Sequence, residues 1–222
     1  VFDKNSIDIS ALKCGFLPQP NGINPPDLDD LLGDLEDETI LEKLNSSSYP
    51  NGNFETTKYP KKALTKTQRK FRKLPGILKG KKLKLTEHLY SKHKKEIVNR
   101  FKHMISNPQN LPENMKTKKF SQRVLKAKWG NSTPNITATS LPDDYVHYSQ
   151  PRTLTVREWA RLQMFPDWYK FCGSRTTGGL RRAGNPQDGN FDRELPKYTQ
   201  IGNAVPVKLA YEIGKHFLSF LK

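Results

Sequence analysis

Basic residues are concentrated in one segment of this chain, which limits how much of it can pack as a core. Residues 61–130 hold 22 Lys and Arg but only 3 Asp and Glu, whereas residues 1–60 hold 4 basic and 11 acidic residues. Hydrophobic residues make up 34% of the 222 residues, less than globular chains usually contain. We therefore expect modest cores under long polar loops, in one medium domain or two small ones.

The basic segment favours a polyanionic partner, because clustered Lys and Arg neutralise phosphates and release the cations condensed on a nucleic acid. A solvated Lys-rich surface is the alternative. Residues 65–73 and 86–105 are predicted helices, the second with one apolar face. That face consists of Val98, Phe101, Met104 and Ile105.

Two histidines, His88 and His93, fall in the first turns of the predicted helix at residues 86–105. They are five positions apart, a spacing that suits metal ligation from a helix poorly. We therefore predict no metal site.

Further helices are predicted near both ends of the chain. Within residues 25–35 one face of a short helix holds Leu28, Leu31, Leu32 and Leu35. Residues 45–60 are predicted to be loop, and short β-type runs lie at residues 136–139 and 145–148.

The pattern at residues 155–158 predicts a capped helix start. Thr155 and Glu158 have the spacing of a capping box, Trp159, Leu162 and Phe165 follow as an apolar stripe, and Pro166 ends the helix. We also expect an ion pair between Glu158 and Arg161.

A final helix is predicted to begin near Asn203 and to tolerate Pro206 in its first turn. Its buried face would be formed by Leu209, Ile213, Phe217 and Leu221.

The 2 cysteines, Cys14 and Cys172, are far apart and lack the spacing of metal ligands. This favours a reducing compartment, the cytoplasm or a eukaryotic nucleus, over a disulfide scaffold. No apolar run reaches about 18 residues and no signal peptide is recognised, so we predict no membrane span. The first residue is Val1 and not Met, and we expect further sequence to precede it.

Two C-terminal segments closely resemble conserved motifs of cytosine-5 DNA methyltransferases. Residues 152–167 (RTLTVREWARLQMFPD) resemble the ninth motif of that family, and residues 198–210 (YTQIGNAVPVKLA) resemble the tenth. Residues 132–139 (STPNITAT) are similar to the strand before the ninth motif. A looser similarity to the family's target-recognition region is carried by Gln68, Arg72, Glu87, His88 and Arg100.

The resemblance implies an α+β fold, in which a small mixed target-recognition domain is followed by helices that complete a Rossmann-like methyltransferase domain dependent on S-adenosylmethionine. We expect the DNA-binding target-recognition domain at residues 1–148. The two motifs would lie at residues 149–222, with the last helix docking on the catalytic domain. The implied partners are double-stranded DNA and the catalytic half of the enzyme, in the same or a separate chain.

The tenth motif implies a contact with S-adenosylmethionine through Gly202, Asn203 and Ala204, in a pocket shared with the catalytic half. Gly202 permits close backbone approach, and Asn203 at a helix start would turn amide groups toward the cofactor carboxylate. An ordinary helix cap is the alternative. The family often has Ser at the position of Ala204, so the side chain here offers no hydroxyl to the cofactor.

The ninth motif organises the target-recognition domain in this family. Structural roles are therefore predicted for Arg152, Thr155, Arg157, Glu158, Arg161 and Gln163. DNA contacts are expected from the Lys-rich run at residues 76–84, from the β-type runs, and from the long connection at residues 173–196, for which a solvated loop is the alternative. The residues expected at DNA are Lys79, Lys81, Lys82, Lys84, Arg123, Thr137, Thr139, Arg175, Arg181 and Arg182.

Four features that the family needs for catalysis are missing. The nucleophile stands after Pro in the family, whereas Lys13 precedes Cys14 and Phe171 precedes Cys172. The Glu-Asn-Val, Gln-x-Arg-x-Arg and Gly-rich first motifs have no acceptable match. We therefore predict no catalytic residue in this chain, which would position DNA while a cytosine is flipped into a site completed by the other half. The alternative is a non-catalytic DNA-binding or regulatory homologue.

Overall fold

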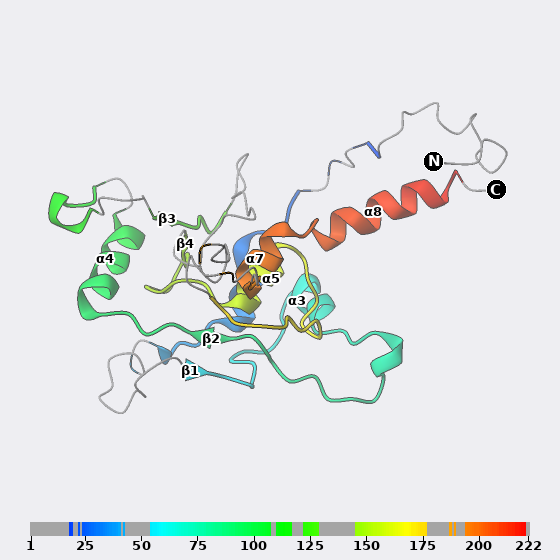
Figure 1. The fold of residues 1–222 in the computed structure, drawn as a ribbon, viewed down its shortest axis with the longest axis horizontal. Coiled ribbons are helices and arrows are strands. Elements are labelled where there is room, and N and C mark those ends of the chain that lie inside the picture. Colours follow the sequence, from blue (N-terminus) through cyan, green and yellow to red (C-terminus); the bar gives the residue numbers. More distant parts are fainter. Residues whose placement is uncertain are drawn as a thin grey trace.

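The structure is a computed structural model, in which helices are joined by long connections and very short strands (Figure 1). It describes residues 18–19, 22, 24–40, 42, 54–107, 110–116, 122–128, 145–176, 187, 189 and 194–220. Of residues 54 and 55 it describes the backbone only. The mixture of helices and strands agrees with the coarse fold class expected from the sequence.

The α-helices are α1 (Leu28–Leu32), α3 (Lys66–Phe71), α4 (Lys95–Ser106), α5 (Val156–Leu162), α7 (Lys197–Asn203) and α8 (Val207–Leu218). Short 3-10 helices are η3 (Gly33–Leu35), η4 (Gly76–Leu78) and η5 (Glu113–Met115). The antiparallel pair β1 (Phe54–Glu55) and β2 (Leu89–Tyr90) places Phe54 opposite Tyr90, and the parallel pair β3 (Arg123–Val124) and β4 (Tyr145–Val146) places Arg123 opposite Tyr145.

The main core is built around α5, which lies near the centre of the molecule (Figure 1). Trp159 of α5 is buried beside Leu154 and Ile201, and its ring meets that of Tyr198 edge-on at 5.9 Å. The predicted leucine face of the first helix is confirmed, since all four of its leucines are buried.

The end of α5 differs from the prediction. The helix ends at Leu162, because Met164 adopts a left-handed backbone with a φ of 61°. The N–H of Met164 bonds to the carbonyl of Arg161 and that of Phe165 to the carbonyl of Ala160, both at 2.9 Å. This is the pattern of a Schellman motif, so the helix stops four residues before Pro166.

The predicted helix at residues 86–105 is too long at its start. Only Lys95–Ser106 is helical, because Glu87 has a left-handed φ of 64° and Leu89–Tyr90 pairs with β1. The predicted apolar face is confirmed for Val98, Phe101 and Met104, which are buried. Phe101 and Met104 form a second small cluster with Val146.

The last helix is also different from the prediction. Asn203 is the final residue of α7, and α8 begins after Pro206. None of the described residues of α8 is buried, and Leu209 is 49% exposed. Figure 1 shows α8 extending away from the other labelled helices and strands. Leu221 lies outside the described residues.

Buried residues on both sides of position 148 share the main core. Leu28, Phe71 and Tyr145 pack in the same cluster as Leu154 and Trp159. The boundary between residues 1–148 and 149–222 therefore stays a prediction. Among the described helices, none is long and apolar enough to cross a membrane.

Candidate DNA-binding and cofactor-contact site

A buried ion pair joins the two ends of the ninth-motif segment. Arg152 donates to both carboxylate oxygens of Glu158, at 2.7 and 2.8 Å. Burial alone would raise the pKa of Glu158, but the charge and hydrogen bonds of Arg152 outweigh it and hold this pKa below its usual range. Glu158 also accepts the backbone N–H of Thr155 at 2.8 Å, which confirms the predicted capping box.

The predicted pairing of Glu158 with Arg161 is wrong, because Arg152 occupies Glu158. Arg161 instead contacts two buried carboxylates outside α5. Its Nε and Nη2 donate to Asp167 at 2.9 and 2.7 Å, and its Nη1 pairs with Asp34. Burial would raise the pKa of Asp167, but the hydrogen bonds and charge of Arg161 hold it below its ordinary value.

Two more segments join the same polar cluster. The hydroxyl of Tyr59 donates to Asp167 at 2.8 Å. Arg72 pairs with Asp34, and its guanidinium carbon lies 3.6 Å from the centre of the Tyr59 ring. Arg161 also donates to the carbonyl of Leu31 at 2.8 Å. The polar cluster of Arg161, Asp34, Asp167, Tyr59 and Arg72 therefore fixes three separate parts of the chain against α5.

Arg157 is buried too, but its side-chain hydrogen bonds go to neutral groups. It donates to the carbonyl and hydroxyl of Thr86 at 3.1 Å each, and to the carbonyls of Pro166 and Tyr169 at 3.2 and 2.8 Å. Burial lowers the pKa of Arg157. This arginine ties Thr86, just after the Lys-rich run, to the turn after α5. Its predicted structural role stays a prediction.

Glu87 connects the same region to α7. Its carboxylate accepts from Nζ of Lys197 at 2.8 and 3.0 Å, and both side chains are largely shielded from solvent. Its backbone carbonyl accepts the N–H of Arg157 at 2.9 Å. The left-handed φ of Glu87 is unusual for a residue other than glycine. The fixed link between α5 and α7 maintains this conformation.

Three histidines are held in their neutral form by burial. Burial lowers the pKa of His88 and of His93 to about 4, and that of His147 to about 3. Nδ1 of His147 accepts two backbone N–H groups at 3.2 Å, so its remaining proton is on Nε2, 3.6 Å from Glu158. Among the described residues, no group of histidines, cysteines and carboxylates could hold a metal ion.

The tenth-motif residues form a corner between α7 and α8. Asn203 is exposed at the end of α7, so the prediction that it begins a helix is wrong. Pro206 supplies no N–H and disfavours a helical residue before it, which separates the two helices. The corner is fixed to α5, because the N–H of Val207 donates to the carbonyl of Gln163 at 3.0 Å.

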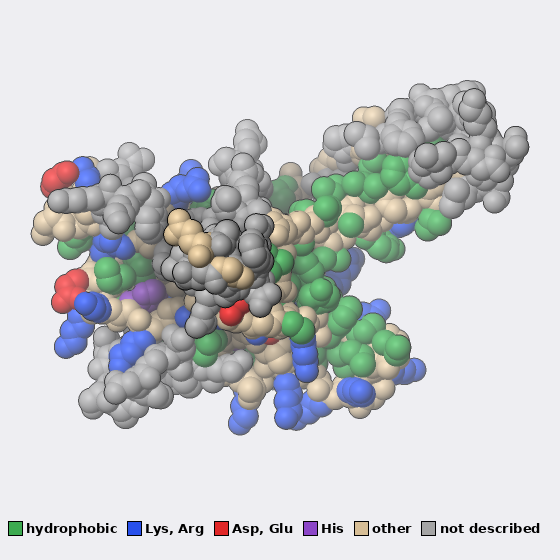
Figure 2. Space-filling model, viewed as in Figure 1, with side chains coloured by type: hydrophobic (Ala, Val, Ile, Leu, Met, Phe, Trp, Pro, Cys, Tyr) green, Lys and Arg blue, Asp and Glu red, His purple; other side chains and the backbone are tan. Residues whose placement is uncertain are grey.

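The Lys-rich run at residues 76–84 lies on the surface. Lys79, Lys81, Lys82 and Lys84 are all exposed. Figure 2 shows Lys and Arg side chains gathered along the lower edge of this face. The run is accessible to a polyanion, as the prediction requires.

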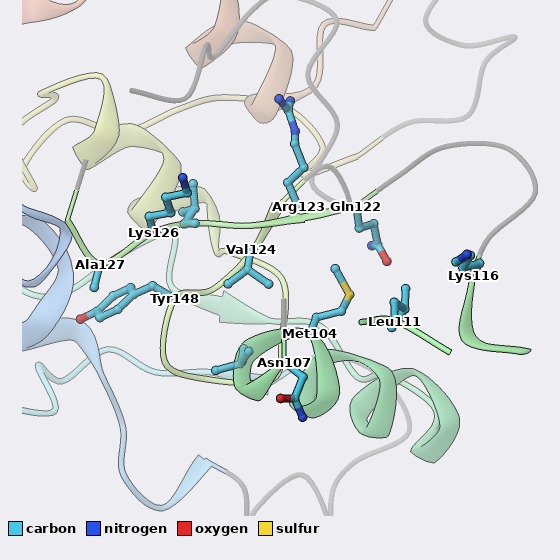
Figure 3. Close-up of a pocket in the computed structure, with 12 residues that line it drawn as sticks. Met104, Asn107, Leu111, Lys116, Gln122, Arg123, Val124, Lys126, Ala127 and Tyr148 are labelled. Atoms are coloured by element: carbon cyan, nitrogen blue, oxygen red, sulfur yellow. The ribbon is translucent and has the colours of Figure 1, made fainter. Parts of the chain in front are cut away.

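Arg123 lies at the rim of a hollow of about 670 Å3 between α4 and β3. The hollow has an apolar floor of Met104, Ile105 and Val124 and carries Lys116 at its side. In Figure 3 the guanidinium of Arg123 points away from Met104 and Val124, and it lies 4.8 Å from the ring of Tyr145. Arg123 is therefore exposed for an external contact.

The remaining predicted DNA residues are only partly described. Arg175 is half-buried and donates to the carbonyl of Leu89 at 3.2 Å, which gives it a structural contact. Thr137, Thr139, Arg181 and Arg182 lie outside the described residues, as do residues 136–139.

Sequence reasoning missed the acids that complete the buried pairs, Asp34 and Asp167, and the link from Glu87 to Lys197. Asp167 is inside the recognised motif, six residues after Arg161, so its spacing offered a signal. Asp34 lies 127 residues from Arg161 and gave none beyond its place in a leucine-rich helix.

Comparison with known proteins agrees with the motif resemblance found in the sequence. The model of the C-5 cytosine-specific DNA methylase family matches residues 36–219. Type II methyltransferase M.DdeI of Desulfomicrobium norvegicum is 29% identical over 160 residues, which cover 72% of this chain and 32% of that protein. The DNA (cytosine-5)-methyltransferase CMT1 of Oryza sativa is 34% identical over 88 residues, which cover 39% of this chain and 6% of that protein.

A second bacterial relative, Type II methyltransferase M.Bpa9945I of Bacillus paralicheniformis, is 38% identical over 105 residues, which cover 43% of this chain and 19% of that protein. The chain therefore belongs to the C-5 cytosine-specific DNA methylase family. It spans about a third, or less, of the length of these curated relatives.

The buried histidines predict that the fold loses stability in mild acid. An unfolded histidine titrates near about 6.5, whereas the folded values are about 4 for His88 and His93 and about 3 for His147. Between these values the unfolded chain binds more protons, so the free energy of unfolding falls as the pH falls. We expect a loss of roughly 3–4 kcal/mol between about pH 7.5 and about pH 5.5.

Urea denaturation at the two pH values measures this loss. Replacing His93 with Gln should reduce it by about a third, because one of the three proton-binding differences is removed. Equal stability of the unsubstituted chain at both pH values would contradict the prediction. The lowered pKa values of Glu158 and Asp167 add a further loss below about pH 5, where carboxylates of the unfolded chain begin to protonate.

Proposed function

We propose that this chain is the DNA-reading C-terminal part of a DNA (cytosine-5-)-methyltransferase, and that it positions duplex DNA for methyl transfer from S-adenosylmethionine to cytosine C5. The catalytic Cys would come from a preceding part of the protein or from a partner chain. The proposal rests mainly on the family match over residues 36–219. Neither of the two cysteines of this sequence, Cys14 and Cys172, follows a Pro, as the catalytic Cys of the family does.

Exposed apolar side chains on α8 support a missing catalytic half. Leu209, Tyr211 and Leu218 of α8, together with Val205 just before it, are 49–66% exposed. A helix this amphipathic gains most of its stability from packing. Docking on the catalytic domain would cover these side chains.

The tenth-motif corner fits one wall of a cofactor pocket. The side chain of Asn203 is exposed, and Gly202 beside it has no side chain to obstruct a ligand. Asn203 would then contact the cofactor from the end of α7, together with the backbone of Gly202 and Ala204. S-adenosylmethionine supplies the methyl group, and these residues only bind and orient it.

A non-catalytic DNA-binding or regulatory homologue is the second candidate, supported by the same missing Pro-Cys context. If this chain is part of a methyltransferase, upstream or adjacent sequence must encode the Gly-rich, Pro-Cys and Glu-Asn-Val motifs. A non-catalytic homologue does not need these motifs.

The chain by itself should transfer no methyl group to DNA, because it lacks the nucleophile that attacks cytosine C6. A tritium-transfer assay with labelled S-adenosylmethionine measures this directly. Addition of the catalytic half should restore turnover. Turnover by the chain alone, abolished in Cys14→Ala or Cys172→Ala, would contradict the proposal.

Replacing Lys79, Lys81, Lys82 and Lys84 with Ala should weaken the salt dependence of DNA binding. The slope of log K against log salt should fall by about 0.9 for each phosphate that the variant no longer neutralises. Titration of duplex DNA at several salt concentrations measures the slope. Lys208→Ala with Lys215→Ala removes two charges from α8 instead, as a control for the position of the lost charge. An unchanged slope in the first variant would place the DNA face elsewhere.

In the enzyme complete with its catalytic half, Asn203→Ala should weaken cofactor affinity by about tenfold, the effect of removing one charge-assisted hydrogen bond. Calorimetric titration with S-adenosylmethionine measures it. Because Asn203 is exposed at the end of α7, the melting temperature and DNA affinity should hardly change. Equal cofactor affinities would leave Asn203 without a role at the cofactor.

A further inference from the structure

An isoleucine at the tip of the Lys-rich run is almost fully exposed to solvent. Ile77 is 90% exposed, more than any other large hydrophobic side chain in the described part of the chain. It belongs to η4, which projects from the body at the right of Figure 1. Figure 2 shows apolar side chains gathered at this end, with Lys and Arg around them.

Backbone hydrogen bonds define the turn at residues 75–81, and this turn holds the Ile77 side chain in solvent. The N–H of Leu78 bonds to the carbonyl of Pro75 at 2.9 Å, that of Lys79 to Gly76 at 3.0 Å, and that of Lys81 to Leu78 at 3.1 Å. Gly80 reverses the chain with a φ of +88°, a conformation that glycine adopts readily. These local bonds hold residues 75–81 as one turn with the isoleucine outward.

The base of this turn is anchored to the body. Leu85 is fully buried, and its N–H donates to the carbonyl of Thr57 at 3.1 Å. Thr86 is held by Arg157, as described above. A rigid projection on a fixed base can insert into a narrow space without losing much freedom.

The charge around the tip selects the partner. Residues 56–86 contain 12 Lys and Arg and no Asp or Glu. Lys73, Lys79, Lys81 and Lys82 are exposed on both sides of Ile77 in sequence. Phosphates would bind these ammonium groups but offer nothing to an isoleucine, whereas base edges and faces lie between two phosphate rows. An apolar side chain flanked by lysines is complementary to a nucleic-acid groove.

We propose that Ile77 is an apolar wedge that enters a groove of duplex DNA and contacts the bases, while the flanking lysines bind the phosphates on either side. Apolar side chains used in this way unstack base steps and bend the duplex. The wedge rests on the proposed DNA-reading function and adds a base-contacting residue to it.

Binding of the full chain to duplex DNA and to heparin tests the wedge. Ile77→Ala should lower DNA affinity by about tenfold with an unchanged salt slope, because the substitution removes apolar packing against the bases and leaves the phosphate-binding lysines in place. Its affinity for heparin, which carries charges but no bases, should stay the same. Leu64→Ala, which also truncates an exposed apolar side chain but just before α3, is the matched control and should change neither affinity.

Methyl NMR of isoleucine-labelled protein supplies a second readout. The Ile77 methyl signal, assigned with Ile77→Val, should move upfield on addition of DNA because of base ring currents, and should stay in place with heparin.

Unchanged DNA affinity in Ile77→Ala overturns the wedge and assigns the tip to a protein contact. Equal losses for DNA and heparin also overturn it, since Ile77 would then only shape the turn. Absence of DNA binding by the unsubstituted chain would instead reject the proposed function.

Discussion

The pairing of Arg161 with Asp34 and Asp167 is the interaction on which the rest of the structure depends. These three side chains are fully buried or nearly so, and removing any one would leave an unpaired charge in the core, at a cost of about 3–5 kcal/mol. Tyr59 and Arg72 complete the same cluster. Because such charges tolerate only matched partners, we infer that the cluster specifies how the acidic N-terminal segment and α3 align against α5. A second buried pair, Arg152 with Glu158, fixes the entry to α5 in the same way.

The side chains proposed to bind ligands are exposed, whereas the segments that carry them are anchored by buried contacts. Arg157 and Glu87 attach the end of the Lys-rich run to α5 and α7. The segments proposed to contact DNA and the cofactor are therefore attached to the same buried core around α5. The exposed lysines and the corner at Asn203 project from it into solvent. A chain organised in this way can orient two ligands relative to each other while contributing few of the reacting groups.

Local sequence patterns predicted the elements whose determinants are local. The capping box at Thr155, the leucine face of α1 and the buried face of α4 follow from spacing alone. The predictions were wrong where contacts beyond the local pattern determine the structure. Leu89–Tyr90 pairs with β1, which overrides the helical pattern around it. Glu158 had a partner at helical spacing in Arg161, but Arg152 binds it instead with bidentate geometry. Asn203 resembled a helix start because the break made by Pro206 was underestimated. The site residues of the motifs were recognisable, whereas Asp34 was not.

The left-handed backbone of Glu87 places two demands on one position. Glycine would adopt this backbone with least strain, yet it would remove the carboxylate that holds Lys197. Asparagine tolerates the same backbone better than glutamate, but it carries no charge and its side chain is shorter. Aspartate tolerates this backbone better and keeps the charge, but its side chain is one methylene shorter. Glutamate reaches Lys197 and therefore retains backbone strain while it links α5 to α7. Relatives in which Lys197 is replaced would be free of the second demand, and glycine or asparagine should then become common at the position of Glu87.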